Sequence, residues 1–474
     1  MGDLGGPVLV ERHSTDFIPH EDRHGKPSDL LFVWFGANME LPVVAAGATT
    51  VISGLGLAWA VLAIVVGVAV GTLFMALHSA QGPHLGLPQM IQSRAQFGYY
   101  GAALPLVFVV VMYLGFYAAG AVLGAQALVA MLHIPLPAGI VILSVLSMAV
   151  AIFGYDLIHR FERYLSYLVA VVFAVLTVTL LAGGHATGPE PVTGHGFLLG
   201  PFLLAVSVSA TSQLGFAPYV ADYSRYLPAR TSIASVFWYT YAGVGISGVW
   251  LMSFGAVLAR DGFSDLVGGI SSVAGGIGGW FVTLVLAALV LGVLSINALN
   301  IYGGYMSSLT FVSTFRRRWR RHGVAPRLWF IVPVAVLATV MSFLYKDNLL
   351  SSFEQFLVMV LALMIPWTSI NLVDYYFVRR GRYQVQDMDQ PRGYYGRINV
   401  PGVVAYVVGF LVQIPFMHNS VYTGPVATAL HDGDISWVVG AVLSGLTYLI
   451  AMRIRPADPV PTTEPLPATG QRGR

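Results

Sequence analysis

The chain has 474 residues, of which 56% are hydrophobic and 10% charged, and its formal net charge is +3. Soluble domains carry about 25% charged residues, so this composition argues against a soluble fold. Cysteine is absent, which excludes disulfides, thiol catalysis and thiolate metal sites. Apolar runs of about 20 residues, each able to cross about 30 Å of hydrocarbon, recur almost from end to end. The sequence therefore predicts an all-α integral membrane protein.

About twelve membrane spans are expected along the chain. Residues 1–29 are polar and contain no apolar core like that of a signal peptide, so we expect the first span to direct insertion itself. Residues 454–474 are rich in Pro and Thr and are expected to form a disordered cytoplasmic tail. The expected spans are 30–55, 58–80, 102–132, 136–153, 164–183, 197–220, 232–258, 279–313, 328–345, 349–378, 399–418 and 435–453.

The basic residues give the orientation. An even number of spans puts both termini on one side, and Lys and Arg accumulate in cytoplasmic segments. With both termini in the cytoplasm, 23 of the 25 basic residues fall inside, and only Arg260 and Lys346 fall outside. Membrane orientation accounts for this charge, so we expect no nucleic-acid partner. We expect a multi-pass protein of a bacterial cytoplasmic membrane.

The chain lacks the common motifs of enzymes. Lys26 lies in His24-Gly25-Lys26-Pro27, which is no phosphate-binding loop, and neither His-Glu-x-x-His nor Gly-x-Ser-x-Gly occurs. We expect no enzymatic activity, no cofactor and no metal site. A channel stays open as an alternative, although the repeated filter residues typical of channels are missing.

Two spans combine Gly, Pro and polar residues near the expected membrane depth. The first contains Gly36-Ala37-Asn38-Met39-Glu40-Leu41-Pro42, and the sixth contains Ser212-Gln213-Leu214-Gly215-Phe216-Ala217-Pro218. Interrupted helices at matching positions of two inverted repeats carry the substrate and ion sites of many transporters. We predict repeats at 30–183 and 197–378, followed by two more spans in 399–453.

Polar side chains within the spans are candidate site residues. Glu40 is a candidate proton carrier, because an ionised carboxylate in the membrane is costly unless it is paired or protonated. The alternative is a glutamate at a helix end that reaches interfacial water. Asn38 is either a substrate ligand or an amide that satisfies helix packing. Asn297 and Asn300 are three residues apart on one helix face and either bind a planar heterocycle or bond a neighbouring helix.

Several stretches, in this order and spacing, resemble one family. The chain is similar to the nucleobase:cation symporter family, in its purine/cytosine permease branch, over nearly its whole length. The resemblance rests on Glu21-Asp22-Arg23, Asp29 to Asn38, Phe153-Gly154-Tyr155 to His159, Glu162-Arg163-Tyr164, Ala221 to Tyr226, Asn297 to Tyr302, Pro366-Trp367-Thr368, Asn371 to Tyr376 and Arg379-Arg380-Gly381.

The resemblance implies a leucine-transporter-like fold, with ten helices in two inverted repeats plus two more, that works by alternating access. It also implies that a flat heterocycle stacks between aromatics of spans three and six and bonds amides of spans three and eight. Relatives often have Trp at the stacking positions, where this chain offers Phe, and Gly120 falls where some relatives have an amide. The matching positions are Phe116 or Tyr117, Gly120, Gln213, Gly215, Phe216, Asn297 and Asn300.

The coupling ion follows from the same comparison. Sodium-coupled relatives bind the ion with carbonyls of span one, here near Ala37, and hydroxyls of span eight, where this chain has the single Ser295 between Leu294 and Ile296. One hydroxyl makes a poor sodium site, so together with Glu40 this favours a proton over sodium.

The expected function is proton-coupled import of cytosine or a purine base, with no obligate protein partner. Sodium-coupled import of hydantoin, allantoin or a thiamine-precursor pyrimidine is the alternative within the family. A passive facilitator or channel is the alternative from another class.

Overall fold

The computed structural model describes residues 17–454, apart from 154, 184–187, 189–193, 195, 264 and 317–323, and for 153, 155–163 and 324–327 it describes the backbone alone. These residues form helices and contain no strand. Nine of the described helices are long and apolar enough to cross a membrane, or ten if a bent pair counts as one span. The prediction of an all-α membrane fold is confirmed. The predicted spans at 136–153 and 399–418 correspond to shorter apolar helices, so the count of twelve stays a prediction.

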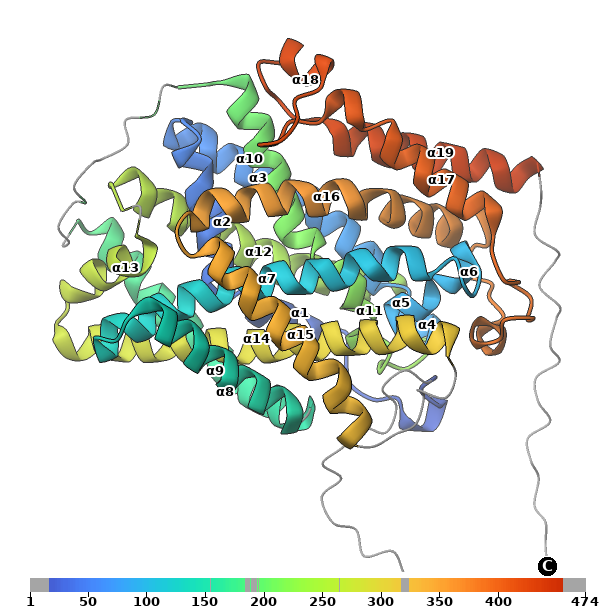
Figure 1. Ribbon diagram of the computed structural model, residues 1–474, viewed down its shortest axis with the longest axis horizontal. Coiled ribbons are helices and arrows are strands. Elements are labelled where there is room, and N and C mark those ends of the chain that lie inside the picture. Colours follow the sequence, from blue (N-terminus) through green and yellow to red (C-terminus); the bar gives the residue numbers. More distant parts are fainter. Residues whose placement is uncertain are drawn as a thin grey trace, which may run out of the picture.

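The elements follow the predicted spans closely (Figure 1). In chain order they are η1 (His20–Asp22), α1 (Asp29–Ala37), α2 (Leu41–Ile52), α3 (Leu57–Ser79), α4 (Gly82–Leu85), α5 (Gln89–Gln92), α6 (Arg94–Phe97), α7 (Ala103–Leu132), α8 (Leu136–Phe153), α9 (Tyr155–Leu181), α10 (Leu199–Leu214), η2 (Ala217–Tyr219), α11 (Val220–Ser224), α12 (Ile233–Arg260), α13 (Leu266–Gly275), α14 (Gly279–Phe315), α15 (Val324–Tyr345), α16 (Leu349–Val373), η4 (Asp374–Val378), η5 (Val385–Asp389), α17 (Val400–Leu411), η6 (Ile414–Phe416), α18 (Pro425–Ala429) and α19 (Ser436–Ile454).

Both predicted interruptions are present. The axes of α1 and α2 differ by 62° across a short break. Glu40 in this break has an extended backbone (φ −139°, ψ 153°), and Pro42, which has no N–H to donate, lies in the first turn of α2. The sixth span ends its α-helix at Leu214 and continues through the short 3-10 helix η2, which contains Pro218.

The packing of the helices follows a regular pattern. The long helices α7 and α14 are the third spans of the two predicted repeats, and they pack against each other. The second span of the first repeat, α3, packs on the first span of the second repeat, α10. In the same way α12, the second span of the second repeat, packs on α2 in the first span of the first repeat. Likewise α15 packs on α7 as α8 packs on α14. Each contact in this set therefore has an equivalent contact between the corresponding helices of the other half, which is the pattern expected of two structural repeats. The boundaries of the repeats remain predictions.

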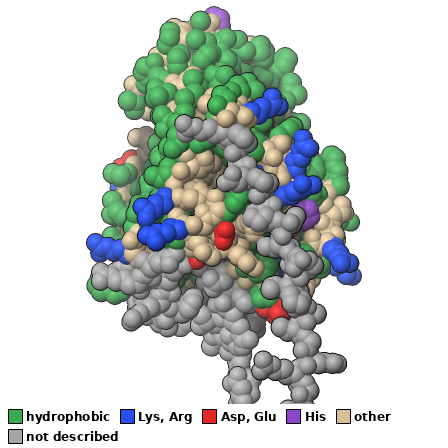
Figure 2. All heavy atoms as spheres, turned by 90° about the vertical axis from the view of Figure 1, so that its right-hand side faces the viewer, with side chains coloured by type: hydrophobic (Ala, Val, Ile, Leu, Met, Phe, Trp, Pro, Cys, Tyr) green, Lys and Arg blue, Asp and Glu red, His purple; other side chains and the backbone are tan. Residues whose placement is uncertain are grey.

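The surface is apolar over the sides of the bundle. Large hydrophobic side chains such as Trp238, Leu337 and Val442 are more than half exposed, which fits contact with lipid. Figure 2 shows Lys and Arg side chains gathered on the end of the molecule that lies at the right of Figure 1, where α14 and α19 end. The orientation across the membrane stays a prediction. Of the predicted tail only Ile454 lies within the described residues, and the first 16 residues lie outside them.

A buried carboxylate joins α19 to the rest of the bundle. The side chain of Asp374, at the end of α16, is fully buried. Its Oδ1 accepts hydrogen bonds from the hydroxyl of Tyr448 on α19 (2.9 Å) and from Nε of Arg379 (3.2 Å). Its Oδ2 accepts hydrogen bonds from Nε2 of Gln96 and from the hydroxyl of Tyr383, both at 2.8 Å. Four donors, from α6, from the loop after η4 and from α19, therefore offset the cost of burying this charge.

Candidate functional site

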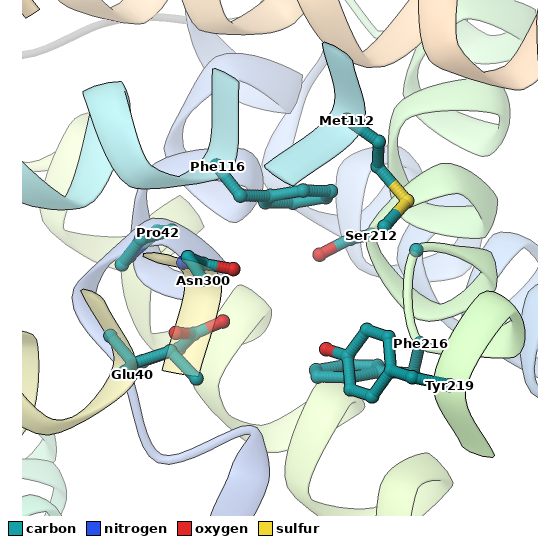
Figure 3. A pocket seen from close by; sticks show the side chains of 10 residues that line it. Glu40, Pro42, Met112, Phe116, Ser212, Phe216, Tyr219 and Asn300 are labelled. Carbon is teal, nitrogen blue, oxygen red and sulfur yellow. The ribbon is translucent and has the colours of Figure 1, made fainter. Parts of the chain in front are cut away.

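A pocket lies where the break between α1 and α2 meets α7, the end of α10 and α14 (Figure 3). It lies between the two predicted repeats and is formed partly by both interruptions. Its lining residues are Glu40, Pro42, Met112, Phe116, Ser212, Gly215, Phe216, Tyr219, Ile296 and Asn300.

Two phenylalanine rings form opposite walls of this pocket. Figure 3 shows the rings of Phe116 and Phe216 on opposite sides, both nearly edge-on to the viewer. Phe356 packs edge-to-face against Phe116, with ring centroids 5.5 Å apart, and Trp34 does the same to Phe216 at 5.8 Å. Each wall is thus held from behind by another aromatic ring. Aromatic side chains of this kind bind planar heterocycles by stacking.

Gly215 sets how close the sixth span comes to the Phe116 wall. A Cβ atom at Gly215 would lie 2.9 Å from both Cε2 and Cζ of the Phe116 ring, closer than van der Waals contact allows. A residue without a side chain is therefore needed for the ring to keep its place. Phe116, Gly215 and Phe216, predicted from the resemblance to share a site, are brought together by the structure.

Polar groups occupy the sides of the pocket. Figure 3 shows the carboxylate of Glu40 and the amide of Asn300 on the same side, between the levels of the two rings, with the hydroxyl of Ser212 across from them. The hydroxyl of Tyr219 lies near the Phe216 ring. The extended backbone of Glu40 precedes α2 and turns this side chain out of the helix path. Aromatic rings and polar side chains therefore line the same pocket.

The amides of Asn38 and Gln213 lie outside the pocket lining. Nδ2 of Asn38 donates to Oε1 of Gln213 at 2.9 Å and to the carbonyl oxygen of Val244 at 3.0 Å. Both side chains are fully buried. The pair connects the break in the first span to α10 and α12, which corresponds to the packing alternative for Asn38.

Tyr117, Gly120 and Asn297 also lie outside the lining and form the contact between α7 and α14. Nδ2 of Asn297 donates to the carbonyl oxygen of Tyr117 at 3.3 Å. A Cβ atom at Gly120 would lie 2.7 Å from Oδ1 of Asn297, so the glycine makes room for this amide. The structure thus separates the two asparagines of α14. Asn300 lines the pocket, whereas Asn297 bonds the neighbouring helix.

The candidate cation residues are Ala37 and Ser295, and neither lines the pocket. Ala37 is the last residue of α1. Ser295 lies on α14, and its buried Oγ has no hydrogen-bond partner among the residues that the structure describes. A buried hydroxyl without a partner is available to a ligand that the structure does not contain.

Sequence reasoning did not identify Pro42, Met112, Ser212, Tyr219 or Ile296 as site residues. Three of them lie four positions before a residue that was identified, and residues at this spacing share a helix face. The pairs are Met112 with Phe116, Ser212 with Phe216, and Ile296 with Asn300. This spacing could therefore have identified Met112, Ser212 and Ile296 as site residues.

Solved structures with the same fold are membrane transporters. Over 95% of each chain, the structure matches the inward-facing conformation of Mhp1 with a TM-score of 0.75 and 19% sequence identity. It also matches Mhp1, a nucleobase-cation-symport-1 family transporter, in a closed conformation with bromovinylhydantoin bound. This second match has a TM-score of 0.70 and 19% identity, over 94% of this chain and 96% of that one. These matches show that the chain has the fold of this membrane transporter.

The sequence comparisons identify the family. Residues 17–440 match the family model described as permease for cytosine/purines, uracil, thiamine, allantoin. YxlA of Bacillus subtilis, which is named as a purine-cytosine permease, is 42% identical over 94% of this chain and 97% of its own. The purine-cytosine permease fcyB of Emericella nidulans is 26% identical over 94% of this chain and 89% of its own. The allantoin permease of Bacillus subtilis is 25% identical over 94% of each chain. The chain belongs to this permease family and is a transporter, not an enzyme.

Proposed function

We propose that this protein imports cytosine or a purine base across the cytoplasmic membrane of a bacterium, by proton symport and alternating access, with both termini in the cytoplasm. One observation carries the proposal: Phe116 and Phe216 face each other across the pocket, with Glu40 and Asn300 at its edge. A nucleobase has two flat faces for the rings and polar edge atoms for the carboxylate and amide. The names of the purine-cytosine permease relatives support the same solute class.

The pocket also fits the affinity that a scavenging transporter needs. Stacking on aromatic side chains contributes about 1–3 kcal/mol per base. Two rings with two or three hydrogen bonds would together supply about 8 kcal/mol, which corresponds to micromolar binding. Glu40 supports coupling to a proton, because it is an acidic side chain in the wall of the solute pocket.

A sodium-coupled importer of hydantoin or allantoin is the second candidate. The unpartnered, buried Oγ of Ser295 favours it, since a hydroxyl on α14 could join carbonyls near Ala37 around a cation. The allantoin permease relative and the hydantoin compound bound to Mhp1 point to the same solute class.

Uptake into proteoliposomes distinguishes these candidates. The purified protein is reconstituted, and radiolabelled cytosine, adenine, hydantoin or allantoin is offered under a proton gradient, a sodium gradient or neither. Proton symport predicts that cytosine or adenine accumulates above its outside concentration under the proton gradient alone and that an uncoupler releases it. Accumulation that requires sodium supports the second candidate. A passive facilitator only equilibrates the solute under every condition.

A variant pair connects the transport to the pocket. Asn300→Ala is expected to raise the apparent KM for the base strongly, because it removes an edge amide. Ser342→Ala is the matched control, since the hydroxyl of Ser342 is buried and donates to the carbonyl of Ala338 on its own helix. An unchanged KM in Asn300→Ala would remove this residue from the site.

A further inference from the structure

Two tyrosines lie in contact at one end of the solute pocket. Figure 3 shows Met112, Phe216 and Tyr219 on the side of the pocket opposite Glu40. On α7, Tyr113 directly follows Met112. The ring of Tyr113 lies 5.6 Å from the ring of Tyr219, centroid to centroid, with the two planes tilted by 32°. Tyr113 is only 6% exposed, so the two rings pack on each other between α7 and η2.

This end of the pocket leads toward α4, α5 and α6. Tyr113 lies three positions before Phe116, on the part of α7 that continues back to α6. Tyr219 lies three positions after Phe216, where η2 continues into α11. Because α5 contacts both η2 and α11, the two chain directions meet at the same end of the molecule. It is the end where Figure 2 shows Lys and Arg side chains gathered, and it is predicted to be cytoplasmic.

Gly303 on α14 makes room for the ring of Tyr113. A Cβ atom at Gly303 would lie 2.6 Å from Cε1 and 2.7 Å from the hydroxyl oxygen of Tyr113. The ring therefore lies against bare backbone of α14 on one side and against Tyr219 on another. A side chain at position 303 would force the ring to shift.

The contact between the two tyrosines joins two separate hydrophobic clusters. Tyr113 belongs to the main core, which extends over α7 and α14. A second, smaller cluster includes Trp34, Phe216 and Val220. Tyr219 packs against both clusters. A movement that separates the clusters therefore breaks the contact between Tyr113 and Tyr219 while the packing inside each cluster is kept.

A hydrogen bond lies beyond the tyrosines in the same direction. The backbone N–H of Gln89 on α5 donates to Oδ1 of Asp222 on α11 at 2.8 Å. Asp222 follows Tyr219 by three positions, on the side away from the pocket. Like the ring contact, this bond joins a segment of the first predicted repeat to a segment of the second. Both contacts must break if the two segments separate at this end.

We infer that Tyr113 and Tyr219 form a gate between the pocket and the end that carries α4, α5 and α6, and that solute passes this end only when the two rings separate. The gate rests on the proposed function, because alternating access requires the pocket to be closed on one side at a time. In the closed gate the rings pack on each other, and Gly303 provides the space for Tyr113. In the open gate η2 carries Tyr219 away from α7.

Cysteine labelling tests the gate directly, because the chain contains no cysteine of its own. In Ser212→Cys a thiol of similar size replaces a hydroxyl that lines the pocket. Glu21→Cys, made in a separate protein, marks the surface next to α4, since Glu21 is exposed and the nearby Arg23 donates to the carbonyl of Pro83. A charged, membrane-impermeant methanethiosulfonate is added to right-side-out and to inside-out membrane vesicles. The vesicles in which Glu21→Cys reacts are those whose α4 end faces the reagent.

Opening the gate should expose the pocket thiol from this side. Combined with Ser212→Cys, Tyr113→Ala removes one ring of the gate, and Gly303→Ala displaces it. Loss of an aromatic contact shifts an equilibrium by up to about tenfold. We therefore expect both variants to raise the modification rate by about this factor in the vesicles that expose the α4 end, with no change in the other vesicles.

Two controls detect general loosening of the protein. Tyr406→Ala removes a buried tyrosine of α17 that lies outside the pocket lining. Gly292→Ala adds a methyl group to α14 at a position where a Cβ comes no closer than 3.9 Å to a neighbouring helix. In both controls Ser212→Cys should react at the rate that it shows alone. Gly303→Ala decides the test by itself if Tyr113→Ala does not fold.

The outcomes separate the gate from the proposed function. Unchanged rates in the gate variants, an increase that is not confined to the α4 end, or an equal increase in the controls would each overturn the gate. The labelling needs no solute, so its result is independent of the uptake assay. Base accumulation with unchanged labelling disproves the gate and keeps the proposed function. A one-sided increase in a protein that takes up no base keeps the gate and disproves the proposed solute.

Discussion

The side-chain amide of Asn38 donates a hydrogen bond to Oε1 of Gln213 across 2.9 Å and so joins the broken first span to the helix that precedes the break in the sixth. Both residues are fully buried. The bond connects the two predicted repeats beside the pocket without forming part of its lining. It is a structural contact between the elements that carry the two breaks.

Removing either amide should destabilise the protein. We expect Asn38→Ala and Gln213→Ala each to cost about 1–3 kcal/mol, because the remaining amide is left buried without its partner. The double variant should cost less than the sum of the two. The Tm of the purified protein in detergent measures the three changes, and Ser342→Ala serves as a control with an intrahelical bond. Strictly additive changes in Tm would show that the two amides do not interact.

A methyl group at Gly215 should weaken solute binding. Gly215→Ala places a carbon 2.9 Å from the Phe116 ring, which must then shift into the pocket or turn away from the solute. We expect at least a tenfold rise in the apparent KM for the base with little change in Tm. Gly245→Ala on α12 is the control, because a Cβ there meets no atom within 4 Å. Equal transport by both variants would show that the position of the Phe116 ring does not limit binding.

Phe216, the ring opposite Phe116, can be tested by substitution. Phe216→Leu keeps an apolar side chain but removes the flat ring, and base stacking of this kind is worth about 1–3 kcal/mol. We expect the dissociation constant for the base to rise roughly 5- to 150-fold. Phe197→Leu is the matched control, because Phe197 is 48% exposed and lies outside the pocket lining. A Phe216→Leu protein that binds the base normally would rule out stacking on this ring.

Loss of the buried carboxylate at Asp374 should be severe. Asp374→Ala leaves the guanidinium of Arg379 without its anion in a largely buried setting, and breaking a buried pair typically costs about 3–5 kcal/mol. We expect a large fall in Tm or a failure to recover folded protein. Asp347→Asn removes a carboxylate whose side chain is 74% exposed and should leave Tm unchanged. A small effect of Asp374→Ala would mean that water reaches this site.

Asp434 should make the stability of the loop before α19 depend on pH. Burial raises the pKa of Asp434, although hydrogen bonds from Ser436 and from the backbone of His418 oppose the shift. A raised pKa means that the folded state holds the proton more tightly than the unfolded chain, so this contribution to stability is present at low pH and is lost as the pH rises through the folded-state pKa. The Tm of the wild type minus the Tm of Asp434→Asn should therefore increase as the pH falls from 7.5 to 4.5. A constant difference between the two proteins would contradict this.

The sequence predicted the fold and about half of the pocket. Hydrophobic run length located the spans, and the Gly and Pro residues around Asn38 and Phe216 located both breaks, because these are local properties of the chain. Glu40, Phe116 and Asn300 were also identified and line the pocket.

The partners of the other amides could not be predicted. Asn297 and Asn300 share a helix face by spacing, yet α7 passes close enough to Asn297 for its amide to bond the carbonyl of Tyr117. Such a partner depends on where two helices cross, which periodicity along one helix does not contain. The same is true of Asn38 and Gln213, which are 175 positions apart.

The hydrogen bond between Asp374 and Tyr448 has a consequence for biogenesis. The two residues are 74 positions apart, so a ribosome that adds about 5–20 residues per second delivers the tyrosine about 4–15 s after the aspartate. During this interval α16 has left the ribosome while one donor to its carboxylate is still missing. We expect nascent chains that stall before α19 to be recognised by membrane quality control, because they expose an incompletely satisfied acid.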